Sequence, residues 1–316
     1  MIKRILVPLD FSASARLALA RAEELAQRTS AELFVLHVGE GLARGAANGG
    51  AAVAPSEVST PEASVESVLA GIVGQLQTRG VRARAAHVLG VPHEKILEAI
   101  SFEKIDLVVM GTRGRRGLAR LVLGSVAERV SHASLSPVIV CRADHEGKTS
   151  ADAAPQQGAS NDQSMQSILV PTDFEPTGEA AVRAAFALAE QTGAKVHLLH
   201  AYPPVVTPGV GGLGSIDFDA LHRHARDRLA AAAKPFANTP SLGKCLGVMG
   251  DPLITIMETA AQLGVGLIVV GTHGRTGIKR ALLGSVAEQI VREAPCPVLV
   301  AKSTSTSQSE LDARPR

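Results

Sequence analysis

Short apolar runs alternate with longer amphipathic stretches along this chain. In the first half, apolar runs at residues 2–7, 33–38, 105–110 and 138–141 have the length of buried strands, and residues 81–89 alternate like a strand. Helical patterns lie between them at residues 14–28, 94–103 and 126–132, and a further helix begins near residue 60 and ends at Gly80. This alternation of strand and helix predicts a parallel, doubly wound sheet.

The second half repeats the series. Its apolar runs are residues 168–170, 195–200, 267–270 and 297–301, and helical patterns occupy residues 179–191 and 286–293. A repeat of this length predicts a duplicated domain rather than a solenoid unit. We therefore predict an α/β chain of two tandem five-stranded, doubly wound, parallel domains at residues 1–145 and 165–303. Residues 146–164 are predicted to be a flexible linker, and residues 304–316 a disordered tail.

A glycine-rich stretch after the fourth strand occurs twice with the same spacing. It reads GTRGRRGLARLVLGS at residues 111–125 and GTHGRTGIKRALLGS at residues 271–285. Glycine lets backbone amides approach a ligand, and the start of the following helix favours an anion, so each stretch predicts phosphate binding. The alternative is that the glycines only make a tight turn and close helix packing, with Ser125 and Ser285 as ordinary helix caps.

The loops after the first and fourth strands border the crevice where a doubly wound sheet binds ligands. Asp10 lies in the first of these loops and Gly111 begins the second, and Asp173 and Gly271 are their counterparts in the second half. Two features noticed separately therefore meet at one predicted site in each half.

The pattern G-x-x-G, nine residues, G-S resembles the ATP-binding signature of the universal stress protein family. The starts ILVPLDFS and ILVPTDFE, the second strands LFVLHV and VHLLHAY, and the last strands SPVIV and CPVLV are also similar to that family. The resemblance implies a Rossmann-like, adenine nucleotide alpha hydrolase-like fold and ATP as ligand, with magnesium as a candidate companion ion.

The resemblance also implies which residues form the two sites. In the first half these are Pro8, Asp10, Val38 and Met110 around adenosine, and Gly111, Arg113, Gly114, Arg115, Gly124, Ser125 and Val126 around the phosphates. In the second half they are Pro171, Asp173, Ala201 and Val270, then Gly271, His273, Gly274, Arg275, Gly284, Ser285 and Val286. Read from the residues alone, the aspartates are alternatively helix caps, Val38, Met110 and Val270 are alternatively core, and His273 is alternatively a surface histidine.

Two of the differences between the sites bear on their affinity for a nucleotide. Arg113 is replaced by His273, whose charge is weaker and depends on pH, and Val38 is replaced by Ala201, which offers less apolar contact to a base. The hypothesis that follows is that the first site binds nucleotide more tightly.

Composition excludes several classes of function. The chain has 32 basic and 30 acidic residues, 3% aromatic residues and no Trp, which argues against nucleic-acid binding. No apolar run approaches the roughly 18 residues of a membrane span, and the N-terminal run is unlike a signal peptide. The three cysteines have no CxxC spacing, so we expect neither disulfides nor a zinc site. A cytoplasmic protein without membrane partners is predicted.

No catalytic or metal-binding residue is predicted, because no Walker A, G-x-S-x-G or H-E-x-x-H motif is present. His222 and His224 are two apart in a predicted helix and therefore face different directions. Gly209, Gly211 and Gly214 fit G-x-G-x-x-G, but prolines separate them from the preceding strand, which favours a flexible loop.

Three functions remain open from the sequence. The leading one is an ATP-binding stress-response regulator with an unknown protein partner. The second is a slow ATPase or autophosphorylating enzyme with Ser125, Ser285, Thr112 or Thr272 as acceptors, and the third is a scaffold with empty sites. The absence of catalytic groups counts against the second, and the intact glycines count against the third.

The last strand of each half would leave an exposed sheet edge, and such edges tend to be paired or covered. In the universal stress protein family, which both halves resemble, such strands pair across a dimer, so the resemblance implies that residues 137–141 and 297–301 pair with each other as a pseudo-dimer within the chain. Pairing between two copies of the chain, as a homodimer, is the alternative.

Overall fold

The computed structural model describes residues 1–39, 62–112, 123–142, 165–202, 218–272 and 284–302. The first half contains β1 (Arg4–Pro8), α1 (Ala13–Thr29), β2 (Glu32–Gly39), α2 (Glu62–Thr78), β3 (Ala83–Leu89), α3 (Pro92–Phe102), β4 (Leu107–Gly111), α4 (Ser125–Ala133) and β5 (Val138–Cys141). The second half contains β6 (Ser167–Pro171), α5 (Pro176–Thr192), β7 (Lys195–Tyr202), α6 (Phe218–Ala233), β8 (Leu242–Met249), α7 (Pro252–Leu263), β9 (Leu267–Gly271), α8 (Ser285–Glu293) and β10 (Val298–Ala301). The predicted linker and tail lie entirely outside the described residues.

All ten strands form one sheet, in the order β3-β2-β1-β4-β5-β10-β9-β6-β7-β8. Within each half every strand pair is parallel, and the first strand lies between the second and the fourth. The strand order therefore reverses beside β1 and beside β6, as in other doubly wound sheets. This confirms the predicted fold class.

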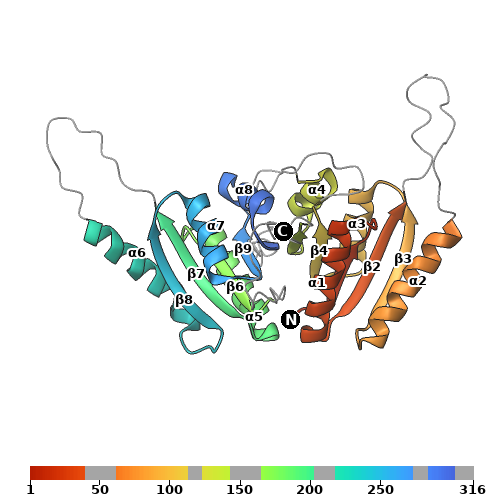
Figure 1. The fold of residues 1–316 in the computed structure, drawn as a ribbon, viewed down its shortest axis with the longest axis horizontal. Helices are drawn as coiled ribbons and strands as arrows, with labels where there is room; N and C mark the ends of the chain where they lie inside the picture. Colours follow the sequence, from red (N-terminus) through yellow and green to blue (C-terminus); the bar gives the residue numbers. More distant parts are fainter. Residues whose placement is uncertain (40–61, 113–122, 143–164, 203–217, 273–283, 303–316) are drawn as a thin grey trace, which may run out of the picture.

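The two halves join through their last strands. β5 and β10 pair antiparallel, with Val140 opposite Val298 and Val138 opposite Val300, so the two five-stranded parts form one continuous sheet across the molecule (Figure 1). The pairing predicted within the chain is thus present. Because both strands have a neighbour on each side, neither leaves a free edge for a homodimer, and the edges of the sheet are β3 and β8.

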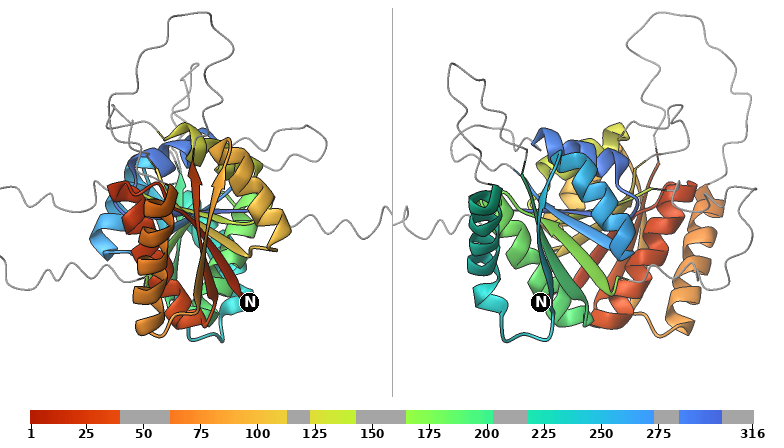
Figure 2. Two further views of the ribbon diagram at one scale, coloured as in Figure 1. Left: turned by 90° about the vertical axis from the view of Figure 1, so that its right-hand side faces the viewer. Right: turned by 60° about the vertical axis from the view of Figure 1, so that its left-hand side comes forward.

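Helices cover both faces of the sheet (Figure 2). Buried residues of α1, α2, α5 and α6 form one core with one face, and buried residues of α3, α4, α7 and α8 form the other. Both cores include residues of both halves. The buried side of α1 is made mostly of small residues, Ala18, Ala22 and Ala26, which let this helix pack closely on the sheet.

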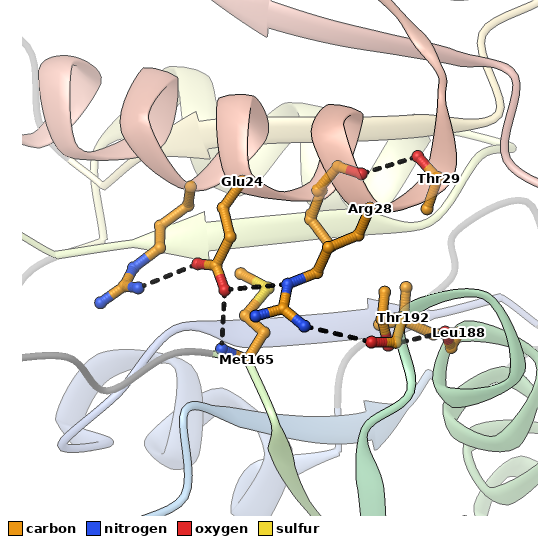
Figure 3. A network of polar contacts seen from close by, with 8 residues as sticks. Glu24, Arg28, Thr29, Met165, Leu188 and Thr192 are labelled. Carbon is orange, nitrogen blue, oxygen red and sulfur yellow. Dashed lines mark hydrogen bonds and ion pairs between the residues drawn. The ribbon is translucent and has the colours of Figure 1, made fainter. Parts of the chain in front are cut away.

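A polar network also connects the halves (Figure 3). The carboxylate of Glu24 on α1 pairs with Arg21 at 3.2 Å and Arg28 at 3.4 Å, and accepts the backbone N–H of Met165 at 3.2 Å. Arg28 donates to the carbonyl oxygen of Thr192 at 3.2 Å. Because Met165 precedes β6 and Thr192 ends α5, helix α1 holds the second half at two points.

Lys302 makes a third link between the halves. It follows β10, and its Nζ donates to the carbonyl oxygen of Ser131 in α4 at 2.5 Å. The side chain is partly buried, and this removal from water lowers the pKa of Lys302 from 10.5 to about 8.

The lowered pKa of Lys302 predicts that the protein becomes more stable as the pH rises above about 8. Between pH 8 and 10.5 the unfolded chain keeps a proton on Lys302 that the folded chain has released, so the free energy of unfolding rises with pH in that window. Between about pH 7.5 and 9.5, we expect the free energy of unfolding of wild type to rise by on the order of 1–2 kcal/mol relative to that of Lys302→Met, measured by urea denaturation. Parallel pH profiles for the two proteins would contradict this.

In the described part of the chain, no helix is both long and apolar enough to cross a membrane.

Candidate functional site

The sheet brings the two predicted loops together in each half. β6 and β9 are hydrogen-bonded neighbours, so the Asp173 loop after β6 and the stretch that begins at Gly271 start side by side. β1 and β4 place Asp10 and Gly111 in the same way. The carboxyl ends of parallel strands at a reversal of strand order are the usual place for a ligand.

A cavity of about 270 Å³ lies at this place in the second half. Its lining contains every second-half site residue that the sequence predicted and the structure describes: Pro171, Asp173, Ala201, Val270, Gly271, Gly284, Ser285 and Val286. His273, Gly274 and Arg275 lie outside the described residues. Four segments far apart in the sequence therefore meet around one hollow.

The same cavity contains residues that sequence reasoning missed. They are Thr172, Thr177, Gly178, Leu199, Pro252, Ile256, Ala287 and Ile290. Most belong to one of three groups: the first turn of α5, the start of α7 and the inner side of α8. Side chains such as Leu199, Ile256 and Ile290 give the cavity an apolar wall, which suits a flat organic ring.

The first-half residues occupy the matching places in the fold. Pro8 ends β1 and Asp10 follows it, Val38 lies in β2, and Met110 and Gly111 end β4. The remaining described residues are at the start of α4, where Gly124 is the N-cap and Ser125 and Val126 are the first helical residues. Arg113, Gly114 and Arg115 lie outside the described residues. Met110 is 3% exposed and Val270 is 4% exposed, so both are core residues, and Val270 lines the cavity as well.

The helix that starts at each Gly-Ser has no side-chain cap among the described residues. The N-cap positions are Gly124 and Gly284, with extended φ/ψ of −62°/143° and −63°/154°, and Ser125 and Ser285 are the first helical residues. The prediction that these serines cap their helices was therefore wrong. Elsewhere Ser12 caps α1 and Asp251 caps α7 through their side chains, whereas the N-caps of α3 and α5, Val91 and Glu175, also make no side-chain cap hydrogen bond.

The lack of a side-chain cap at the starts of α4 and α8 has a chemical consequence. The first N–H groups of a helix have no partner within it, and with the helix dipole they attract anions. At α8, whose first turn lines the cavity, no side-chain oxygen satisfies these groups in the described part of the site. A phosphate placed there would accept their hydrogen bonds.

The first glycine of each stretch has a packing role. A Cβ on Gly111 would lie 2.7 Å from the carbonyl carbon of Ser14, and a Cβ on Gly271 would lie 2.1 Å from the carbonyl oxygen of Thr177. These distances are shorter than any carbon–oxygen or carbon–carbon contact that proteins tolerate. For these two glycines the tight-packing interpretation therefore holds, whatever they also do for a ligand.

The two aspartates form matching turns. Oδ1 of Asp10 accepts the N–H of Ser12, and Oδ1 of Asp173 accepts the N–H of Glu175, each at 3.0 Å. The N-caps of α1 and α5 are Ser12 and Glu175, so the alternative that the aspartates cap these helices was wrong. In each case the second carboxylate oxygen is not used by the turn.

The described residues contain no group of three or more His, Cys, Asp or Glu that could hold a metal ion. Thr112 and Thr272 are 6% and 3% exposed, and the hydroxyl of Thr272 donates to the carbonyl oxygen of Ala301, so neither is accessible as a phosphate acceptor. His222 is engaged with the hydroxyl of Tyr202 at 2.5 Å.

Comparison with known proteins agrees with the fold and the repeat. The sequence model of the universal stress protein family matches residues 1–142 and 165–302. A universal stress protein of Mycobacterium tuberculosis is 30% identical over 203 residues, which cover 63% of this chain and 62% of that protein's length. One of Methanocaldococcus jannaschii is 30% identical over 155 residues, covering 45% of this chain and 96% of that protein.

Solved structures show the same architecture over almost the whole chain. A universal stress protein from Archaeoglobus fulgidus superimposes with a TM-score of 0.62 at 20% identity, covering 95% of this chain and 98% of that one. A crystal structure from Pseudomonas aeruginosa gives a TM-score of 0.64 at 18% identity, covering 95% and 93%. The family match to both halves, together with this shared fold, shows that the chain belongs to the universal stress protein family.

Proposed function

We propose that the protein binds ATP at the cavity of the second half, and at the matching place of the first, and acts as a nucleotide-responsive regulator in the stress response. The observation that carries the proposal is the meeting of three features in one cavity: an aspartate turn, an apolar wall and an uncapped helix start. These features suit the three parts of a nucleotide.

Each part of ATP has a matching surface. The apolar wall with Val270, Ile256 and Ala201 suits the base, and the carboxylate of Asp173 suits a ribose hydroxyl that needs an acceptor. The first turn of α8 suits a phosphate. The cavity volume of about 270 Å³ is close to the lower end of the range for small-molecule sites, about 300–1,000 Å³.

Magnesium fits the described site only as a companion of the nucleotide. Asp173 is the one acidic side chain among the described residues that line the cavity. Magnesium prefers several oxygen ligands and retains water readily. The phosphates of the nucleotide and water would therefore supply most of its oxygen ligands.

A regulator is favoured over the other two functions. An ATPase needs a group that activates water, and Asp173 is the one carboxylate that the described lining supplies as a general base. Against a scaffold with empty sites count the glycines of the repeated stretch, which are intact in both halves. The protein partner of the regulator is not specified by these features. Cytoplasmic location is part of the proposal, and it is supported by three cysteines that are all free thiols.

Calorimetric titration with ATP and magnesium tests the proposal and ranks the two sites. We expect wild type to bind ATP, and Gly114→Asp and Gly274→Asp each to remove binding at one site, because an added carboxylate repels phosphate. The site that remains in Gly274→Asp should be the tighter, since Arg113 stands where the second site has His273. A tighter site in Gly114→Asp would reverse the ranking, and no binding by wild type would reject the proposal.

A further inference from the structure

A histidine of the second strand holds the residue before the aspartate in both halves. Nδ1 of His37 lies 2.6 Å from the carbonyl oxygen of Leu9, and Nδ1 of His200 lies 2.8 Å from the carbonyl oxygen of Thr172. A carbonyl oxygen only accepts, so Nδ1 is the donor in each pair. The two histidines are 163 residues apart, as are the two aspartates, so the fold makes the same contact twice.

The residue after each aspartate packs on the same histidine. The ring of Phe11 lies 4.8 Å from the ring of His37, and the ring of Phe174 lies 4.4 Å from that of His200, measured between centroids. In the second half the guanidinium of Arg228 covers the ring of Phe174 as well, at 4.6 Å.

Both phenylalanines have an unfavourable backbone conformation. Their φ angles are +63° at Phe11 and +62° at Phe174, in the left-handed region that bulky residues rarely adopt. Such a conformation persists only where surrounding contacts enforce it. The histidine supplies two of these contacts, one on each side of the aspartate, and the turn formed by the carboxylate supplies a third.

The histidine lies away from the cavity. Leu199 and Ala201 line the cavity, whereas His200 between them does not, as expected for the alternating side chains of a strand. An effect of His200 on a ligand is therefore indirect, and its contacts with Thr172 and Phe174 lead to the Asp173 turn.

We propose that His37 and His200 are positioning residues that fix the Asp10 and Asp173 carboxylates for the nucleoside part of the ligand. The proposal rests on the proposed function. Nδ1–H anchors the carbonyl before the aspartate, and the imidazole ring holds the phenylalanine after it in the left-handed conformation. The phosphate part of the ligand, bound at the start of α8, does not depend on this histidine.

The test compares ATP with inorganic triphosphate, in a full-length chain whose first site carries Ser125→Asp. His200→Leu removes the Nδ1 donor and is expected to weaken ATP binding about tenfold, the equivalent of one lost hydrogen bond. Its affinity for inorganic triphosphate should stay unchanged. His200→Asn keeps an N–H near the position of Nδ1 and should recover most of the ATP affinity, whereas His200→Gln, whose amide reaches toward the Nε2 position, should not.

The outcomes separate the two proposals. If the Ser125→Asp chain and wild type bind no ATP, the proposed function fails. If that chain binds ATP and the Leu and Gln variants bind it equally well, the positioning role fails while the proposed function stands. Equal losses of ATP and inorganic triphosphate would mean a general structural role for His200 and would also overturn the inference. The Asn and Gln pair decides the question if the Leu variant does not fold.

Discussion

Gly271→Ala is expected to lower the free energy of unfolding by about 3 kcal/mol, a large effect for one added methyl group. The new Cβ would lie 2.1 Å from the carbonyl oxygen and 2.6 Å from the carbonyl carbon of Thr177. Both are backbone atoms in the first turn of α5, so no side chain can rotate to make room. β9 and α5 would have to separate, and with them the two walls of the cavity.

Gly71→Ala is the matched control for this substitution. Gly71 lies inside α2, and a Cβ there would have nothing within 4 Å. Alanine has the higher helix propensity, so the control should be neutral or stabilising by up to about 1 kcal/mol. Urea denaturation of the three proteins gives the comparison. A Gly271→Ala protein as stable as Gly71→Ala would show that the close approach of β9 to α5 is not required.

Ser285→Asp is expected to weaken ATP binding at the second site about a hundredfold, while leaving the protein folded. The carboxylate would stand in the first turn of α8, where it competes with phosphate for the N–H groups and repels it. An acidic residue in that turn favours the helix itself, so loss of binding would not reflect unfolding.

Ser285→Asn tests whether the charge of the aspartate, rather than its size, weakens ATP binding. Asparagine has the size of aspartate without its charge, and we expect it to weaken ATP binding by no more than about fivefold, because electrostatic repulsion is absent. Calorimetry in the Ser125→Asp background gives both affinities. If the two variants bound ATP equally well, the phosphate would not lie at the start of α8.

Much of the fold follows from patterns in the sequence. The alternation of apolar runs and helical stretches predicted the parallel sheet, because that signal depends on local periodicity. The β5–β10 pairing was predicted from the exposed edges of the last strands and from the resemblance to a family in which such strands pair. β8 was less evident. Its sequence LGKCLGVM carries two glycines and a lysine, and at the sheet edge all of its residues are at least partly exposed, so no apolar alternation marks it.

The residues that line the cavity could be predicted where they belong to the repeated sequence motifs, and not elsewhere. Comparison of the two glycine stretches identified residues such as Gly284 and Ser285, which the structure brings to the cavity. Pro252 and Ile256 were missed because they come from α7, whose place over the sheet is set by packing rather than by a motif.

Two local features were ambiguous in the sequence for a physical reason. A Gly-Ser pair before a helix is compatible with a cap at either residue, and only the extended backbone of Gly284 shows which one it is. A glycine that approaches a ligand and a glycine that packs against a helix look the same in sequence. The backbone of Thr177 beside Gly271 identifies the second role.

Native mass spectrometry of the purified full-length protein, with bound small molecules released and identified, tests the central claim most directly. The account predicts ATP or another adenine nucleotide at one or two copies per chain, on the protein as purified or after addition of ATP and magnesium. Detection of no nucleotide under both conditions would contradict it.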